Sequence, residues 1–208
     1  MLKSPKNLGI IHFIGIGGIG MSGIAEILFQ SGYNVQGSDL KHSNNTNRLE
    51  KLGIKVYIGQ KKSNIIDAKI IVVSTAISEK NEEFIAAKKM FLPIVHRSEM
   101  LGELMRLKQS IAIAGTHGKT TTTSLIAKMI EENGMDPTII NGGIISSLNS
   151  NARLGKGEWM VVEADESDGS FTKLNPTVAI ITNIDLEHLD YHKTEDNLEK
   201  AFHNFVSS

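Results

Sequence analysis

The sequence predicts an α/β fold in two units, each built around a parallel β-sheet. Three features carry this prediction. Short apolar runs alternate with segments of helical periodicity, glycine-rich loops follow the runs near residues 15 and 115, and polar residues gather after the later runs. A chain that alternates strands and helices builds parallel sheets with helices on both faces. We expect the units to span residues 1–107 and 108–208.

The elements of the first unit follow from hydrophobic periodicity. Short apolar runs predict strands, and apolar residues three or four apart predict helices. Gly32 and Gly53 stand where helices end. The predicted strands are Leu8–Ile14, Tyr33–Gly37, Ile54–Ile58, Ile70–Ser74 and Pro93–His96. The predicted helices are Met21–Gln30, Thr46–Leu52, Glu82–Met90 and Arg97–Leu107.

The second unit continues the same alternation but with fewer clear strands. Its predicted helices are Lys119–Asn133 and Thr194–Phe205. Its clearest strands are Ser110–Ala114, Trp159–Glu163 and Val178–Thr182, in an incomplete sheet of about four strands. Asn141–Gly157 is rich in Gly, Asn and Ser, which predicts a long loop.

Composition excludes several classes of function. Lys and Arg number 22 and Asp and Glu 23, so bulk charge predicts no nucleic-acid partner. Without cysteine, the chain has no disulfide, thiolate metal site or cysteine nucleophile. The apolar run Leu8–Phe29 follows Lys3 and Lys6, but its glycines make a poor helix, so we expect neither export nor membrane insertion. Oligomeric state is left open.

A glycine-rich loop follows the first predicted strand. Gly15, Gly17, Gly18 and Gly20 satisfy the G-x-G-x-x-G pattern before a helix. Such glycines allow a tight turn, close approach of the backbone to phosphate, and helix packing. Asp39 ends the second predicted strand, where a carboxylate accepts from a ribose hydroxyl. The pattern predicts a nucleotide diphosphate site, and NAD and a sugar nucleotide both remain open.

A second loop has the residues of a triphosphate site. Gly118, Lys119 and Thr120 stand between a predicted strand and a predicted helix. In such loops the backbone amides wrap the phosphates, the lysine reaches the β- and γ-phosphates, and the hydroxyl ligates Mg²⁺. A strict pattern needs glycine at position 113, which is Ile113, so the loop is a shortened variant.

Carboxylates and histidines follow the two later strands of the second unit. Glu163, Asp165, Glu166 and Asp168 would repel one another without compensation, and a divalent cation that takes oxygen ligands would supply it. His188 lies in a polar segment after the next strand, at the same expected sheet edge, and is a candidate second metal ligand.

Two further histidines lie inside predicted elements. His117 lies within the phosphate loop, which predicts a functional position without defining its role. His12 lies in the centre of a buried strand and is expected to serve the core or to support the site from behind.

Taken together, these motifs resemble the Mur ligase family. The matching segments occur in the family's order and cover nearly the whole chain: HFIGIGGIGMSGIAEIL (12–28), GSD (37–39), STAI (74–77), HRSEML (96–101), AGTHGKTTTT (114–123), EADESDGSF (163–171) and TNIDLEHLDYH (182–192). The GTxGKT form of the phosphate loop is specific to this family and its folylpolyglutamate-synthase relatives. The resemblance is greatest to the branch that adds L-alanine.

The resemblance implies roles for individual residues. It implies a Rossmann-like first domain that binds a UDP-sugar and a central P-loop domain that binds ATP. The implied UDP-sugar residues are Gly15, Gly17, Gly18 and Gly20, with Asp39, Ser74 and His96. The implied ATP-phosphate residues are Gly115, Thr116, His117, Gly118, Lys119, Thr120 and Thr121. Thr120 and Glu163 would ligate one Mg²⁺ and His188 a second, and Lys119, Glu163 and His188 would be catalytic.

The implied reaction joins L-alanine to the carboxylate of UDP-N-acetylmuramate through an acyl phosphate, in cytoplasmic peptidoglycan precursor synthesis. Members of this family have three domains and exceed the 208 residues of this chain. We therefore expect the central domain to be incomplete here, the C-terminal amino-acid-binding domain to be absent, and this chain alone not to complete the ligation.

The sequence allows three other interpretations of its function. The chain could be a nicotinamide-dependent oxidoreductase that uses the first glycine-rich loop, but this interpretation leaves Lys119 and Thr120 without a function. A non-catalytic module would bind a nucleotide or UDP-sugar without turnover. The branch of the same family that attaches a recycled tripeptide shares the AGTHGKTTT and EADE patterns, but departs from GIGGIGMSG, ESDGSF and EHLDYH.

Overall fold

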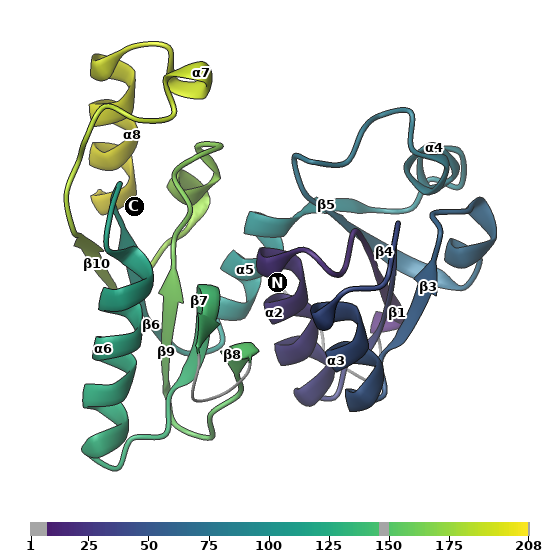
Figure 1. Cartoon of the computed structure of the whole chain (residues 1–208), viewed down its shortest axis with the longest axis horizontal. Coiled ribbons are helices and arrows are strands. Elements are labelled where there is room, and N and C mark those ends of the chain that lie inside the picture. Colours follow the sequence, from purple (N-terminus) through teal and green to yellow (C-terminus); the bar gives the residue numbers. More distant parts are fainter. Residues whose placement is uncertain (1–7, 146–149, 208) are drawn as a thin grey trace. The chain divides into compact units, whose positions relative to one another are not determined.

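The chain folds into two compact units, shown in Figure 1 by a computed structural model that describes residues 8–145 and 150–207. The units are Met1–Met100 and Leu101–Ser208. Within the described residues each unit holds one five-stranded sheet. The predicted α/β class with parallel sheets is confirmed, and the strands and helices named from the sequence lie within two residues of their observed bounds.

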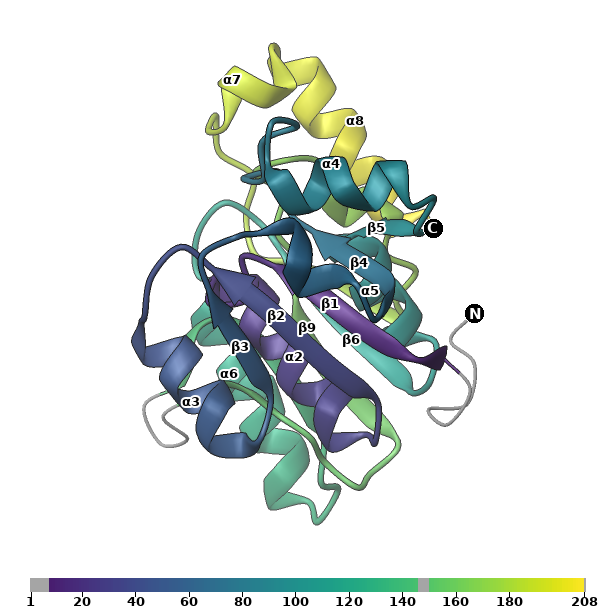
Figure 2. The same cartoon turned by 90° about the vertical axis from the view of Figure 1, so that its right-hand side faces the viewer.

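The sheet of the first unit is entirely parallel (Figure 2). Its strand order is β3-β2-β1-β4-β5. The strands are β1 (Ile10–Ile14), β2 (Asn34–Asp39), β3 (Lys55–Ile58), β4 (Ala68–Val73) and β5 (Ile94–His96). The order reverses direction between β1 and β4, and ligands of such sheets bind outside the carboxyl ends of the strands at that point.

Capping residues define the helices that connect these strands. The helices are α2 (Ile19–Gln30), α3 (Asn44–Leu52), the short η1 (Lys62–Ile65), α4 (Glu82–Lys89) and α5 (Arg97–Met105). Ser43 and Thr46 form a reciprocal capping box at the start of α3, and Gly53 ends it with φ of 100°. The side chain of Asn81 accepts from two backbone amides at the start of α4.

A polar network lies inside the first unit. Glu83 of α4 is fully buried and accepts from the hydroxyl of Ser38 at 2.5 Å and from the amide of Asn64 at 2.6 Å. The ring of His12 lies 3.3 Å from the same carboxylate and 3.2 Å from the amide nitrogen of Gln36. His12 is fully buried in β1, as expected for a core residue. Each polar side chain of the network therefore has a polar partner within hydrogen-bonding distance, as buried polar groups usually do.

The sheet of the second unit has the order β10-β6-β9-β7-β8. Its strands are β6 (Gln109–Ala114), β7 (Thr138–Ile145), β8 (Ser150–Arg153), β9 (Trp159–Glu163) and β10 (Val178–Ile181). The helices are α6 (Lys119–Glu132), α7 (Leu189–His192) and α8 (Glu195–Val206), with the short η2 (Ser170–Lys173). Ile113, Ala127, Ile139 and Val161 form a buried core between α6 and the sheet. Phe171, Phe202 and Phe205 pack together where α8 meets η2.

The prediction of a long loop at Asn141–Gly157 is wrong where β7 and β8 lie, and the described part of the sheet has five strands where about four were expected. Strand β7 runs parallel to β9 and pairs antiparallel with β8. Composition concealed both strands, because β7 contains Asn141, Gly142 and Gly143 and β8 reads Ser-Asn-Ala-Arg, all residues of low strand propensity. Pairing of β7 with the central strand β9, and of β8 with β7, outweighs that propensity.

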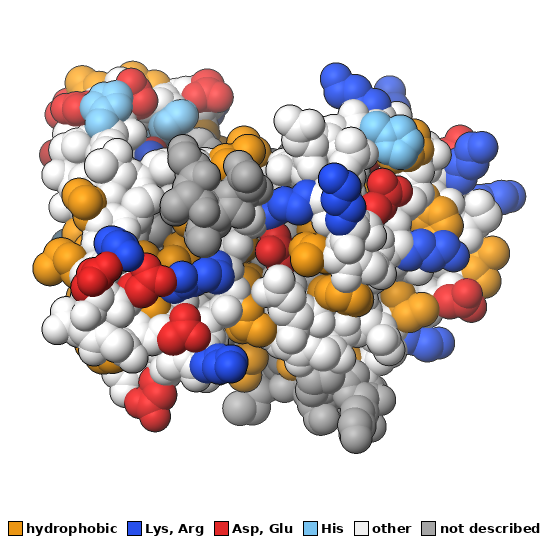
Figure 3. Space-filling view, turned by 60° about the horizontal axis from the view of Figure 1, so that its bottom comes forward, with side chains coloured by type: hydrophobic (Ala, Val, Ile, Leu, Met, Phe, Trp, Pro, Cys, Tyr) orange, Lys and Arg blue, Asp and Glu red, His pale blue; other side chains and the backbone are white. Residues whose placement is uncertain are grey.

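Charged side chains of both signs lie on the surface of the molecule (Figure 3). On the face shown in Figure 3, basic and acidic side chains are interspersed with neutral and apolar ones, in keeping with a formal net charge of −1. Across residues 8–145 and 150–207, no helix combines the length and apolar character that crossing a membrane requires.

Candidate phosphate site and glycine-rich loop

The loop between β6 and α6 depends on glycine at two positions. Gly115 has φ of +130°, and a Cβ atom there would lie 2.1 Å from the hydroxyl oxygen of Thr182. Gly118 has φ of +78° and stands immediately before α6. Both residues adopt backbone conformations that other residues rarely take. The loop therefore brings the amides at the start of α6 to the carboxyl edge of the sheet, where they can hold an anion.

The segment after β10 braces this loop from behind. The backbone amide of Thr116 donates to the carbonyl of Asn183 at 3.1 Å, and its hydroxyl accepts from the amide of Asp185 at 2.8 Å. The amide of His117 donates to the side chain of Asn183 at 2.9 Å. The carbonyl of His117 accepts from the hydroxyl of Thr182 at 2.6 Å. The loop thus holds its shape through contacts with residues far along the chain.

Lys119 points back into the loop. Its ammonium nitrogen lies 2.6 Å from the carbonyl oxygen of Gly115, 3.1 Å from that of Thr116 and 2.8 Å from a carboxylate oxygen of Glu166. The Lys119 side chain is 15% exposed. A cation in this position can meet phosphate oxygens at the start of α6.

Thr120 and Glu163 form a pair of oxygen ligands beside Lys119. The hydroxyl of Thr120 donates to Glu163 Oε2 at 2.9 Å, and the amide of Gly142 donates to the same oxygen at 2.9 Å. A Cβ atom at Gly142 would lie 2.4 Å from Glu163 Oε1, so glycine leaves room for the carboxylate in its present position. Hydroxyl and carboxylate oxygens suit Mg²⁺, so the residues present fit this cation.

Glu166 is a buried acid at the centre of the site. Its residue is 1% exposed, and Oε1 lies 2.8 Å from Lys119 Nζ and 3.6 Å from His188 Nε2. Burial raises the pKa of the Glu166 carboxyl above its ordinary value, although the hydrogen bond from Lys119 acts in the opposite direction. The predicted metal ligand His188 is therefore near the loop, in contact range of Glu166, and has a left-handed backbone with φ of 55°.

The four clustered carboxylates have separate local partners. Glu163 meets Thr120 and Glu166 meets Lys119, as described above. Asp165 accepts from the hydroxyl of Ser167 at 2.7 Å, and Asp168 accepts from the amide of Ser170 at 3.0 Å, so both shape the turn after β9. The repulsion expected between them is thereby reduced.

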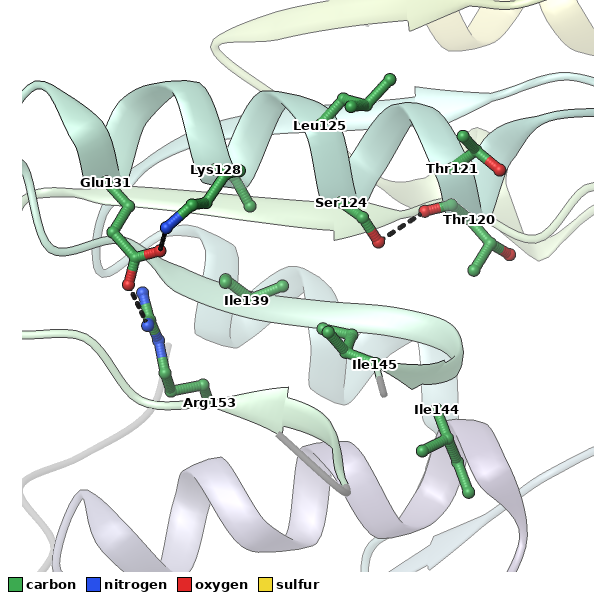
Figure 4. A pocket seen from close by; sticks show the side chains of 11 residues that line it. Thr120, Thr121, Ser124, Leu125, Lys128, Glu131, Ile139, Ile144, Ile145 and Arg153 are labelled. Atoms are coloured by element: carbon green, nitrogen blue, oxygen red, sulfur yellow. Dashed lines mark hydrogen bonds and ion pairs between the residues drawn. The ribbon is translucent and has the colours of Figure 1, made fainter. Parts of the chain in front are cut away.

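His117 and Thr121 lie at the rim of the site. The ring of His117 is 60% exposed and stands 3.5 Å from Asp185 and 3.7 Å from Glu187. Thr121 lines a cavity of about 520 Å³ between α6 and β7, together with Thr120 and Ser124 (Figure 4). The other end of that cavity carries an ion-paired group of Lys128, Glu131 and Arg153.

The glycine-rich loop of the first unit joins β1 to α2. The amides of Gly15 and Ile16 donate to the carbonyl of Ser38 at 2.8 and 2.9 Å. Asp39 Oδ2 accepts from the amide of Gly17 at 2.9 Å, and a Cβ atom at Gly17 would lie 2.8 Å from that same oxygen. A Cβ atom at Gly20 would lie 2.7 Å from the guanidinium of Arg97. The loop is therefore closely packed, with Gly18 exposed at its tip.

The other residues predicted to hold a UDP-sugar lie at the same edge of this sheet. Asp39 ends β2, Ser74 directly follows β4 and His96 ends β5, so all stand at the carboxyl ends of parallel strands. The ring of His96 lies 2.9 Å from the hydroxyl of Ser98. In this structure Asp39 holds the loop itself, because its Oδ2 accepts from the amide of Gly17.

Three contributions to the phosphate site were not assigned from the sequence. Glu166 appeared only as one of four carboxylates, Gly142 as part of a loop, and Thr182 as the end of a strand. Motif spacing does not distinguish Glu166 from its neighbours, because all four carboxylates follow one strand. The unusual glycine pair at 142 and 143 was the available signal for the approach of β7.

Two family profiles match consecutive parts of this chain. The profile described as the Mur ligase family, catalytic domain, matches residues 10–109. The profile described as the Mur ligase middle domain matches residues 113–208.

Curated relatives are similar over the entire chain. UDP-N-acetylmuramate–L-alanine ligase of Parvibaculum lavamentivorans is 61% identical over 208 residues, which are 100% of this chain and 42% of that protein. The ligase of the same name from Methylocella silvestris is 60% identical over 207 residues, covering 44% of its length. The chain thus spans less than half the length of these relatives.

Solved structures share the fold. UDP-N-acetylmuramate-alanine ligase from Thermotoga maritima is 33% identical with a TM-score of 0.89, over 95% of this chain and 46% of that one. UDP-N-acetylmuramate:L-alanyl-gamma-D-glutamyl-meso-diaminopimelate ligase from Neisseria meningitides is 30% identical with a TM-score of 0.89, over 96% of this chain and 68% of that one.

Proposed function

Because this chain belongs to the Mur ligase family, we propose that it is part of an ATP-dependent ligase that joins L-alanine to UDP-N-acetylmuramate. The observation that carries the proposal is the phosphate loop in which Lys119 stands beside the Thr120–Glu163 oxygen pair. The product would be a peptidoglycan precursor. ATP as co-substrate supports a cytoplasmic location.

The first unit would bind the UDP-sugar. Its glycine-rich loop, the α2 start and the residues Asp39, Ser74 and His96 share one sheet edge, where diphosphate and sugar groups bind in folds of this kind. The second unit would bind ATP, with the loop amides and Lys119 on the phosphates and Thr120 and Glu163 on a Mg²⁺ ion. His188 would help to hold a second Mg²⁺.

The proposed chemistry has two steps. A carboxylate oxygen of the muramate bonds to the γ-phosphorus of ATP while the bond from that phosphorus to ADP breaks, giving an acyl phosphate. The amine of L-alanine then bonds to the acyl carbon and loses a proton, while the bond from that carbon to the phosphate oxygen breaks. Mg²⁺ supplies positive charge that lets two anions meet.

The residues of this chain would act mainly by placing groups. The positive φ angles of Gly115 and Gly118 fix a loop that surrounds the phosphates without a side chain in the way. Lys119 supplies positive charge to the terminal phosphates, and the brace from Thr182 and Asn183 keeps the loop rigid. Positioning and charge stabilisation together account for most catalysis of phosphoryl transfer.

The choice of L-alanine as the added group rests on relatedness. Curated L-alanine ligases are 57–61% identical to this chain over its full length. Among the solved structures, the Thermotoga maritima L-alanine ligase is 33% identical and the Neisseria tripeptide ligase 30%. The matches to curated L-alanine ligases therefore support L-alanine over the tripeptide.

Calorimetric titration tests the two binding roles separately. We expect micromolar binding of UDP-N-acetylmuramate, no binding of NADH, and binding of the ATP analogue AMP-PNP in the presence of Mg²⁺. Lys119→Met should abolish AMP-PNP binding and leave UDP-N-acetylmuramate binding unchanged. Binding of NADH in place of the UDP-sugar would contradict the proposal.

A further inference from the structure

The ammonium of Lys119 has all of its hydrogen-bonding capacity in use. A lysine ammonium has three donors and no acceptor. In this structure three oxygens lie within 3.1 Å of it: the carbonyls of Gly115 and Thr116 and the carboxylate Oε1 of Glu166. Phosphate oxygens can therefore approach this ammonium fully only if one of those partners leaves.

Glu166 is the partner whose departure the site favours. The two carbonyls belong to the loop backbone, which Thr182 and Asn183 hold in place. The Glu166 side chain is buried, and its second oxygen, Oε2, has no hydrogen-bond partner among the described residues. A buried carboxylate oxygen without a donor is costly, so the present arrangement of Glu166 is incompletely stabilised.

Glu166 also carries the same sign of charge as an incoming phosphate. Two anions that share one cation oppose each other, and juxtaposed like charges reduce affinity strongly in partly buried sites. We propose that Glu166 is a built-in competitor of the terminal phosphate: it holds Lys119 while the loop is empty and must release it when a nucleoside triphosphate binds. This inference rests on the proposed nucleotide binding.

The ion pair gives Glu166 a positioning role for Lys119. It keeps the ammonium folded into the loop, at 15% exposure, and prevents it from extending into solvent. His188 Nε2 lies 3.6 Å from the same Glu166 oxygen, so this carboxylate lies between two nitrogen groups in the present structure. We therefore expect Glu166 to weaken nucleotide binding while it keeps the Lys119 ammonium in place before the nucleotide arrives.

The test measures the affinity of the chain for AMP-PNP with Mg²⁺, using Glu166→Gln. The substitution keeps the size of the side chain and removes its charge. We expect AMP-PNP to bind about tenfold more tightly than to the unaltered chain. ADP should gain less, because it lacks the terminal phosphate that competes. A residue with a purely structural role would give weaker binding when altered, so the direction of change is decisive.

Two further variants show whether the effect depends on the reach of the Glu166 carboxylate and on its place beside the loop. Glu166→Asp retains the charge but shortens the side chain, and we expect a smaller gain for AMP-PNP because the carboxylate withdraws from the ammonium. Glu132→Gln is the matched control at the opposite end of α6, about 20 Å from the loop, and should not change affinity. Circular dichroism confirms folding of each variant.

The outcomes separate this inference from the proposed function. If the unaltered chain binds AMP-PNP but Glu166→Gln and Glu166→Asp bind it equally or less well, Glu166 is not a competitor and the inference is overturned. If neither the unaltered chain nor any variant binds AMP-PNP while the fold is intact, the nucleotide assignment itself fails, and the inference fails with it.

Discussion

The hydroxyl of Thr120 donates to the carboxylate of Glu163 across 2.9 Å, although 43 residues separate them in the chain. Thr120 lies in the first turn of α6 and Glu163 at the end of β9. The same Glu163 oxygen accepts from the amide of Gly142 in β7. Three elements of the second unit therefore converge on one carboxylate oxygen, and a divalent cation there would be sensitive to each.

We predict that Thr120→Val removes most of the effect of Mg²⁺ on nucleotide affinity. The valine side chain has nearly the same shape but offers no oxygen to the cation. AMP-PNP affinity measured with Mg²⁺ should fall by about tenfold or more, and affinity measured with EDTA should change little. Thr120→Ser retains the hydroxyl and serves as the control. An equal loss with and without Mg²⁺ would point to a packing effect.

Gly115→Ala should destabilise the second unit. The residue has φ of +130°, and the new methyl group would meet the Thr182 hydroxyl at 2.1 Å. We expect the free energy of unfolding to fall by more than about 2 kcal/mol in urea denaturation. Gly134→Ala is the matched control, with φ of +76° and no atom within 4 Å of the added carbon, and should cost about 1 kcal/mol. Equal losses would show that the clash is relieved by movement.

Glu83→Ala should lower the stability of the first unit by about 3 kcal/mol, because it leaves buried partners of the carboxylate unpaired. Those partners are His12, Ser38 and Asn64. The adjacent Glu82 is exposed in the same helical turn, and Glu82→Ala should cost less than about 1 kcal/mol. Thermal and urea denaturation measure both. A small loss for Glu83→Ala would mean that the network reorganises without it.

Asp39→Ala should weaken UDP-N-acetylmuramate binding by about tenfold, because the Gly17 amide loses its acceptor and the loop loosens. Asp39→Asn keeps an acceptor oxygen and should bind within about threefold of the unaltered chain. Calorimetry with the UDP-sugar checks both. If Asn and Ala lose affinity equally, the charge of Asp39 matters to the ligand and its hydrogen bond to Gly17 does not.

Local patterns in the sequence are enough to predict most of the fold. The predicted strand Trp159–Glu163 has the observed bounds, and the predicted helix at Lys119 has the observed start. Both predictions succeed because apolar runs and the glycines that end them are local features of the sequence. Strands β7 and β8 were not predicted, because their residues form strands only through pairing with β9 and with each other. Tertiary pairing of this kind leaves no periodic signal.

The residues of the candidate site could be predicted from the sequence, but their contacts could not. The loop glycines, Lys119 and Thr120 follow a known spacing, so their placement together was expected. The pairing of Lys119 with Glu166 was not, since four carboxylates follow one strand and only the turn after β9 decides which of them faces the loop. Side-chain direction in an irregular turn depends on packing, for which a motif carries no information.

The brace behind the phosphate loop also has a consequence for protein synthesis. Residues of the loop are held by partners that lie 65 to 69 positions later in the chain. At about 5–20 residues per second, translation reaches those partners roughly 3–14 seconds after the loop itself. During that interval the nascent loop lacks the hydrogen bonds that the residues after β10 supply in the folded protein.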